Sequence, residues 1–88
     1  MKYMLVGVFE REICVPEIFD THDEALDRMC EEVSDVWTVP VEEIKESYLQ
    51  GVEYNDSTCV IENAAWAERF GRNFDWKIFT INDNGEIA

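Results

Sequence analysis

The sequence predicts an α+β domain in which a small antiparallel sheet of three or four strands packs one face against two acidic amphipathic helices. The helices are indicated by apolar residues that recur at helical spacing over residues 21–37 and again over 41–49. The sheet is indicated by β-forming residues that alternate over residues 76–81. With 88 residues, of which 47% are hydrophobic, the chain is long and apolar enough to fold as a single domain over residues 1–88.

The N-terminal part predicts two strands joined by a tight turn. Residues 3–9 are nearly all apolar and include aromatic and β-branched side chains, which indicates a central strand covered on both faces. A polar turn over residues 10–12 leads to a second strand over residues 13–15, antiparallel to the first. Pro16 cannot donate to a strand ladder, so this second strand should be short or lie at an edge of the sheet.

Residues 21–37 predict an amphipathic helix of about four turns. Thr21 and Glu24 have the spacing of a capping box, in which each side chain satisfies a backbone donor of the other residue. The apolar side chains fall within an arc of about 140°, and the acidic ones fall within about 120° on the opposite side. The apolar set is Ala25, Leu26, Met29, Cys30, Val33, Val36 and Trp37, and the acidic set is Asp20, Asp23, Glu24, Asp27, Glu31 and Asp35.

A second helix is predicted to begin at Pro40, because a proline needs no backbone donor in the first helical turn. Gly51 provides a C-terminal cap. Glu42 and Glu43 lie in the first turn, where negative charge suits the helix dipole. The apolar positions that repeat at helical spacing are Val41, Ile44, Tyr48 and Leu49.

The C-terminal third predicts two further strands, over residues 58–61 and over residues 76–81. Residues 62–70 fit two interpretations, because their alanines favour a short helix, whereas Trp66 lies in an alternating pattern that would extend the strand. A turn is predicted over residues 71–73, and the last three residues are expected to fray.

The excess negative charge of the chain lies between residues 10 and 62. This stretch holds 16 aspartates and glutamates against three basic residues and carries the whole formal net charge of −13, while the remaining residues balance. At neutral pH such a charge repels nucleic-acid backbones and anionic membranes and attracts basic surfaces. We therefore expect neither nucleic acid nor a membrane as a direct partner. We also expect stability to rise with salt, because salt screens the internal repulsion.

The acidic face of the first helix and the start of the second form the candidate binding site. Carboxylates four residues apart on a helix are about 6 Å apart along its axis, and phosphates recur about every 3.4 Å along one strand of a duplex. A rigid line of carboxylates can therefore occupy a basic groove that normally holds DNA or RNA. The alternative is a solvated face that keeps a small protein soluble. The predicted partner-binding residues are Asp20, Asp23, Asp27, Glu31, Asp35, Glu42, Glu43 and Glu46.

In length, charge and lack of a catalytic motif, the chain resembles the small acidic nucleic-acid-mimic inhibitors made by phages and mobile elements, among them the anti-CRISPR proteins. The resemblance covers the composition of the whole chain and rests on no sequence motif. It implies a basic nucleic-acid-binding protein as the partner, such as a CRISPR effector, whose groove the acidic helices would block.

No motif for catalysis or for a cofactor accompanies the charge, so we expect a non-enzymatic protein without a cofactor or a metal. His22, the only histidine, falls in a capping turn on the surface with no nucleophile placed beside it. Carboxylates are so numerous that their pairing does not indicate hydrolysis. Residues 80–85 resemble part of a calcium loop but lack its first acidic ligand, which favours a plain turn.

The cysteines and aromatic residues have mainly structural interpretations. Cys14, Cys30 and Cys59 fall in apolar patterns without metal-type spacing, which favours buried free thiols in a reducing cytoplasm. The N-terminal apolar run is too short for a membrane span and has no signal-type cleavage segment. Core packing is favoured for the aromatic residues over a base-stacking platform or a protein-contact patch joined by Arg69 and Arg72. These residues are Trp37, Trp66, Phe70, Phe74 and Trp76.

A second functional hypothesis competes with the acidic inhibitor. The chain would then be a small accessory or regulatory domain that binds through an apolar or aromatic surface, either to another protein or to a further copy of itself. Salt would change the affinity of such a surface little, whereas an acidic site should associate quickly at low salt and slowly at high salt. The sequence leaves the oligomeric state open.

Overall fold

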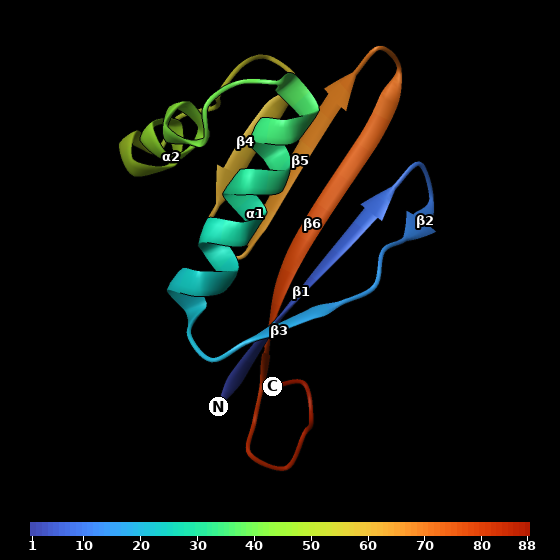
Figure 1. Ribbon diagram of the computed structural model, residues 1–88, viewed down its shortest axis with the longest axis vertical. Helices are drawn as coiled ribbons and strands as arrows, with labels where there is room; N and C mark the ends of the chain where they lie inside the picture. The colour runs from blue at the N-terminus through green and yellow to red at the C-terminus, as the bar shows by residue number, and fades with distance from the viewer.

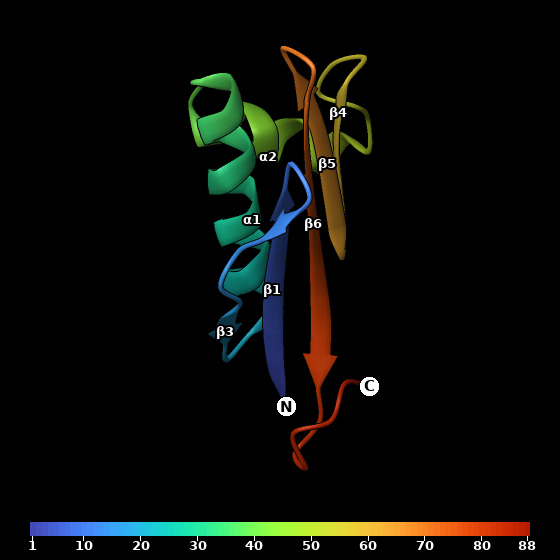
Figure 2. The ribbon, with the colours of Figure 1, turned by 90° about the vertical axis from the view of Figure 1, so that its right-hand side faces the viewer.

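The computed structural model describes residues 1–88 as two layers, a twisted six-stranded antiparallel sheet and two helices on one of its faces (Figures 1 and 2). The predicted α+β class is confirmed, although the sheet has more strands than expected. The strands are β1 (Lys2–Phe9), β2 (Glu12–Ile13), β3 (Glu17–Phe19), β4 (Thr58–Ile61), β5 (Ala64–Arg69) and β6 (Arg72–Ile81), and the helices are α1 (His22–Trp37) and α2 (Val41–Gln50).

The first and last strands of the chain lie side by side in the middle of the sheet. The strand order is β2-β1-β6-β5-β4, and β3 pairs with β1 on the same edge as β2. β1 and β6 pair from Lys2 opposite Ile81 to Phe9 opposite Phe74. Because β1 and β6 are neighbours, the sheet forms only when the N-terminal and the C-terminal strands pair with each other.

Pro16 divides one edge of the sheet into two short strands. The second strand predicted over residues 13–15 is reduced to β2, and β3, which the sequence did not predict, follows the proline. A proline has no N–H for the ladder, so the pairing with β1 stops before Pro16 and resumes after it. Short, interrupted edge strands of this kind offer little template for pairing with other chains.

The ambiguous segment over residues 62–70 contains β5, so the strand interpretation is confirmed and the helical one is wrong. Ala65 and Ala67 are buried on the helix side, while Trp66 and Glu68 point to the opposite face. Small side chains below α1 let the helix lie close to the sheet. The alanines that favoured a helix locally are therefore used for packing within a strand.

Two hairpin turns have both central residues in the left-handed region of backbone space. Phe70 and Gly71 connect β5 to β6 with φ of 55° and 76°, so the turn comes earlier than the predicted turn over residues 71–73. Glu10 and Arg11 connect β1 to β2 with φ of 51° and 71°. Such turns match the twist of antiparallel strands, but only the glycine adopts the conformation without steric cost.

α1 begins at the predicted capping box. The backbone N–H of Glu24 donates to Thr21 Oγ1 at 3.2 Å, while the Glu24 carboxylate accepts from the Thr21 hydroxyl at 3.0 Å instead of from its backbone. The predicted apolar arc faces the sheet. The helix ends at Thr38, whose φ of 56° is left-handed. A β-branched residue in this conformation is strained by roughly 1–2 kcal/mol.

α2 follows Pro40 and ends at Gly51, which has a φ of 69° as its predicted role as a C-terminal cap requires. Ile44 is fully buried, but Leu49, predicted to lie on the same apolar face, is exposed. Ser47 is buried in its place, and its hydroxyl donates to the Ile44 carbonyl at 2.8 Å. Because this hydroxyl is satisfied within its own helix, the serine can face the core.

The core lies between the helices and one face of the sheet. No helix covers the other face (Figure 2), so the prediction that the strand over residues 3–9 is covered on both faces is wrong. The buried apolar side chains come from both helices and four strands, and they are Leu5, Ala25, Met29, Cys30, Val33, Ile44, Val60, Ala65, Ala67, Trp76 and Ile78.

The end of the chain is bound back to the sheet, contrary to the fraying expected for the last three residues. The backbone N–H of Ala88 donates to the carbonyl of Thr80 at 2.8 Å. Ile87 forms a β-bridge with Ile81, the last residue of β6. The backbone polar groups of the C-terminus therefore find partners in the strand that precedes it.

Candidate interaction surfaces

The eight predicted partner-binding carboxylates lie on the side of the sheet that carries the helices, and we call them the acidic helical layer (Figure 2). All eight side chains are exposed. Asp23, Asp27, Glu31 and Asp35 follow one another at four-residue spacing, so their carboxylates form a row along α1 with a step of about 6 Å. Asp20 precedes this row, just before the helix begins.

The two helices bring their acidic faces together at one ion pair. Lys45 Nζ of α2 lies 3.1 Å from Asp27 Oδ1 of α1, and its hydrogen bond to this aspartate raises the pKa of Lys45. Glu42 and Glu43 occupy the first turn of α2, and Glu46 follows one turn later. The row on α1 and the acidic start of α2 therefore lie on the same side of the sheet, and one lysine of α2 joins the two helices.

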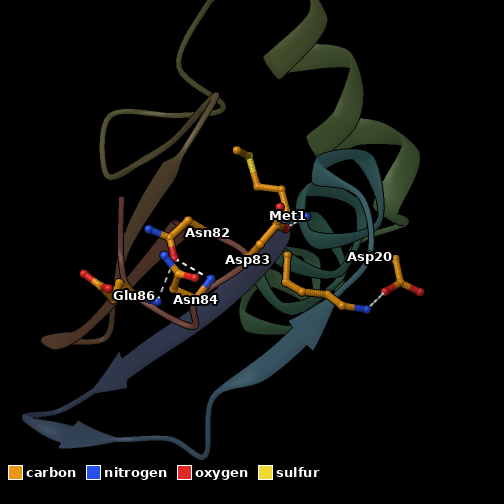
Figure 3. Close-up of polar contacts among 7 residues, drawn as sticks. Met1, Asp20, Asn82, Asp83, Asn84 and Glu86 are labelled. Atoms are coloured by element: carbon orange, nitrogen blue, oxygen red, sulfur yellow. Dashed lines mark hydrogen bonds and ion pairs between the residues drawn. The ribbon is translucent and has the colours of Figure 1, made fainter.

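Internal partners engage part of the acidic helical layer. Three of the eight carboxylates form ion pairs, and two accept hydrogen bonds from neutral side chains. The ion pairs are Lys2–Asp20 (Figure 3), Arg28–Glu31 and Lys45–Asp27, and the hydrogen bonds are Tyr54–Glu43 and Gln50–Glu46. Asp23, Asp35 and Glu42 have no side-chain partner. Water screens exposed pairs of this kind, so they hold the layer together only weakly.

Glu32 differs from the other carboxylates of α1 because it is half-buried and faces the sheet. It borders a hollow of about 310 Å³ that Phe9 and Phe74 also line. Burial raises the pKa of Glu32, and the positive charge of Arg28 opposes this rise. The buried Nε1 of Trp76 makes no hydrogen bond, but the indole lies close enough to favour the charged form of Glu32 slightly.

His22 ties the N-terminus of α1 to the turn between β4 and β5. Its Nε2 lies 2.9 Å from the carbonyl oxygen of Glu62 and 2.9 Å from Oδ1 of Asn63. A carbonyl oxygen can only accept, so Nε2 donates to it. The ring also stands edge-on to Tyr3, with centroids 5.7 Å apart. The residue predicted as a surface member of a capping turn is therefore a half-buried link between two elements.

The three cysteines are free, and their exposure differs. Cys30 is buried as predicted, whereas Cys14 and Cys59 are only half-buried. Burial raises the pKa of each thiol, to about 11 for Cys30. The reactive thiolate form is therefore suppressed at neutral pH at all three positions.

The aromatic residues do not form one platform. Trp76 is buried and stacks on Phe74 with ring centroids 6.3 Å apart, and Trp37 donates its Nε1 to a buried threonine of β4 at 2.7 Å. Core packing is therefore confirmed for these three residues. Phe70 is exposed at the tip of a hairpin, and Trp66 is exposed on the opposite face of the sheet.

Arg69, which the sequence suggested as a contact residue, stabilises the C-terminus of α1 from β5. Its Nη1 donates to the carbonyl of Val36, and its guanidinium carbon lies 5.2 Å from the ring centroid of Trp37 and 4.8 Å from that of Phe70. The last turn of α1 contains no basic residue, so Arg69 supplies the positive charge that the helix dipole favours. Its neighbour Arg72 has no side-chain partner, and both arginines border a hollow of about 460 Å³.

The face of the sheet opposite the helices is apolar and uncovered, and we call it the open sheet face. Directly paired residues of antiparallel strands point to the same face of a sheet, so the pairing register shows which residues belong to the open sheet face. Ile13, Ile18, Ile61 and Trp66 are 72%, 54%, 48% and 43% exposed. Between them lies a hollow of about 370 Å³ over β1, β5 and β6. The other apolar members are Met4, Val6, Val8, Cys59, Ala64, Phe79 and Ile81, and the polar members are Lys2, Glu68, Asn73, Asp75 and Lys77.

The segment that resembles part of a calcium loop forms a turn that is closed by its own residues. Asn82 Oδ1 accepts from the backbone N–H groups of Asn84 and Glu86, both at 3.0 Å (Figure 3). Asp83 accepts a hydrogen bond of 2.9 Å from the amino group of Met1, which lowers the pKa of the carboxyl. No group of three or more His, Cys, Asp or Glu side chains lies close enough together to hold a metal ion.

The fold and its surfaces define an acidic two-layer α+β domain with an acidic helical layer on one side and an apolar open sheet face on the other. Neither helix is long and apolar enough to cross a membrane. Comparisons with protein-family models, with curated proteins and with solved structures found no match. The chemistry of the two surfaces is therefore the evidence on function.

Proposed function

We propose that the protein is a non-enzymatic interaction domain whose acidic helical layer binds a basic protein surface. The observation that carries this proposal is the exposed row of four carboxylates on α1, which lies on the same side of the sheet as the acidic first turn of α2. In its sharpest form the protein is a nucleic-acid mimic that blocks the basic groove of a nucleic-acid-binding protein such as a CRISPR effector. The resemblance in size and charge to mimic inhibitors supports this form.

The spacing of the row suits a groove that normally holds a phosphate backbone. Its step of about 6 Å is close to the distance of about 7 Å along the duplex axis between every second phosphate of one strand. Asp23, Asp35 and Glu42 have no internal partner, so their charges are available to lysines and arginines of a partner. Long-range attraction between the net charge of −13 and a basic groove would also speed the encounter.

A charge-reversal variant at the two ends of the row tests the proposal. Asp23→Lys combined with Asp35→Lys breaks no internal contact. A lysine at position 23 interacts unfavourably with the dipole at the N-terminus of α1, but a lysine at position 35 interacts favourably with the dipole at its C-terminus, so the two effects offset each other. The matched control is Glu53→Lys combined with Glu86→Lys. It changes the net charge by the same amount at two exposed positions outside the helices.

The assay is capture from a bacterial lysate on each immobilised variant, at about 50 mM and at about 200 mM salt. Parent and control should retain nucleic-acid-binding proteins at the lower salt, and added duplex DNA or RNA should release them. The helix variant should retain far less of these proteins. If it captured and released them as the parent does, the mimic form of the proposal would be wrong.

A second candidate function is favoured by the exposed apolar side chains of the open sheet face. The domain would then be a small accessory or regulatory module that binds through this face. Trp66→Ala should remove such binding at any salt concentration, whereas reversal of Asp23 and Asp35 should leave it unchanged. The two candidates are therefore separable with the same set of variants.

A further inference from the structure

We propose that two copies of this chain pair face to face through the open sheet face and form a two-fold symmetric dimer. The product has four layers, with the two sheets inside and the helices of each copy outside. This inference goes beyond the proposed function, because the acidic helical layer of each copy stays free for another partner.

The open sheet face is large enough for a stable interface. Five strands lie side by side across the sheet, about 4.8 Å apart, and the ten residues of β6 extend about 33 Å along it (Figure 1). A standard interface takes roughly 800 Å² from each partner, a patch about 28 Å on a side. Monomers rarely leave a contiguous apolar surface of more than a few hundred Å² open to water. A covered state is therefore expected for this face.

The charge distribution favours a second copy over a strongly charged partner. The acidic side chains lie mostly on the helix side, whereas the centre of the open sheet face carries one acid and one base, Asp75 and Lys77 of β6. The other charged members of the face, Lys2 and Glu68, lie toward its two ends. Consider a two-fold axis that lies midway between the two sheets, runs perpendicular to the strands and passes over Trp76 of β6. It places Asp75 of each copy opposite Lys77 of the other. The centre of the face is thus complementary to itself in charge.

The shape of the open sheet face is complementary to itself about the same axis. Ala65 pairs with Trp76 in the sheet, so the axis also crosses β5 at Ala65. Trp66 of one copy then lies over Ala64 of the other, and a large side chain meets a small one. Ala64 lines the hollow of about 370 Å³ together with Val6 and Phe79, and the indole of the second copy would fill this hollow. Aromatic anchors that enter apolar pockets are typical of stable interfaces.

Sedimentation equilibrium from about 1 μM to about 1 mM protein, at physiological salt, tests the proposal. The wild type should be a reversible dimer. Trp66→Ala and Asp75→Lys should each weaken the dimer by about tenfold or more, the first by emptying the hollow and the second by placing like charges opposite each other. Asp35→Lys, which makes the same change in net charge at an exposed position of α1, should leave the dimer unchanged.

The charge swap is the decisive variant. Asp75→Lys combined with Lys77→Asp restores opposite charges across the axis, so it should return the dissociation constant to within about threefold of the wild type. Urea midpoints establish that each variant folds, and both swapped positions are exposed. A wild type that stays monomeric over the whole range would overturn the proposal and leave the face to a different partner. A charge swap that dimerises no better than Asp75→Lys alone would also overturn it.

Discussion

Replacement of Arg69 by methionine tests how far the end of α1 depends on a residue of β5. Arg69 donates to the carbonyl of Val36, one of the last carbonyls of the helix, which have no partner within it. A hydrogen bond from a charged donor contributes roughly 1.5–3 kcal/mol, and the contact with the Trp37 ring contributes roughly 0.5–1 kcal/mol. One guanidinium makes both contacts, so the two contributions overlap. We expect Arg69→Met to lower the free energy of unfolding by about 2–3 kcal/mol.

Urea unfolding followed by far-UV circular dichroism measures this loss. Arg72→Met is the matched control, because it removes the same charge from an exposed arginine without a side-chain partner, and it should change stability by less than about 0.5 kcal/mol. Arg69→Lys should fall between the wild type and Arg69→Met, because lysine keeps the charge but loses the planar donor geometry. Equal midpoints for Arg69→Met and Arg72→Met would refute the role assigned to Arg69.

Three further predictions concern strain, pH and salt. Thr38→Gly should raise the free energy of unfolding by about 0.5–1 kcal/mol in urea, because glycine relieves the left-handed strain at the end of α1. Part of this gain is cancelled because glycine loses more conformational entropy on folding than threonine. Burial raises the pKa of Glu32 in the folded state, so its charge destabilises the fold at neutral pH, and this penalty fades as pH falls through the raised pKa toward the ordinary value of 4.5. Glu32→Gln should therefore stabilise the protein at neutral pH and lose that advantage below about pH 4, and a gain in stability that is the same at about pH 4 and about pH 7 would contradict this. The melting temperature should rise with sodium chloride, because screening weakens the repulsion within a chain of net charge −13, and a flat or falling curve would contradict this.

The helices could be predicted from the sequence because their signals are local. The capping box at Thr21 and Glu24, the apolar arc of α1 and the glycine at position 51 all act within a few residues of each other. The row of exposed carboxylates followed from the same periodicity, since residues four apart share a helix face wherever the helix packs. The acidic helical layer was therefore foreseen, although its partners Lys2 and Tyr54 were not.

The strands and the open sheet face depend on partners far away in the chain. Ala65 favours a helix by propensity, and its strand conformation follows from pairing with Trp76 and from packing below α1. The uniformly apolar β1 suggested cover on both faces, but the chain supplies helices for one face only. Arg69 contacts a carbonyl 33 residues earlier, a relation that no local pattern encodes.

The two proposed surfaces respond to salt in opposite directions, and this follows from where the charges lie. Helices are about 10 Å across and packed sheets lie about 10 Å apart, so the acidic helical layers of a face-to-face dimer are about 30 Å from each other. Screening acts over about 8 Å at physiological salt and about 30 Å at 0.01 M. Repulsion between the acidic helical layers of the two copies is therefore negligible at physiological salt and substantial at about 0.01 M salt. The dimer should weaken as salt is lowered. Binding of a basic partner to the acidic helical layer should instead weaken as salt is raised, because there the same carboxylates provide the attraction.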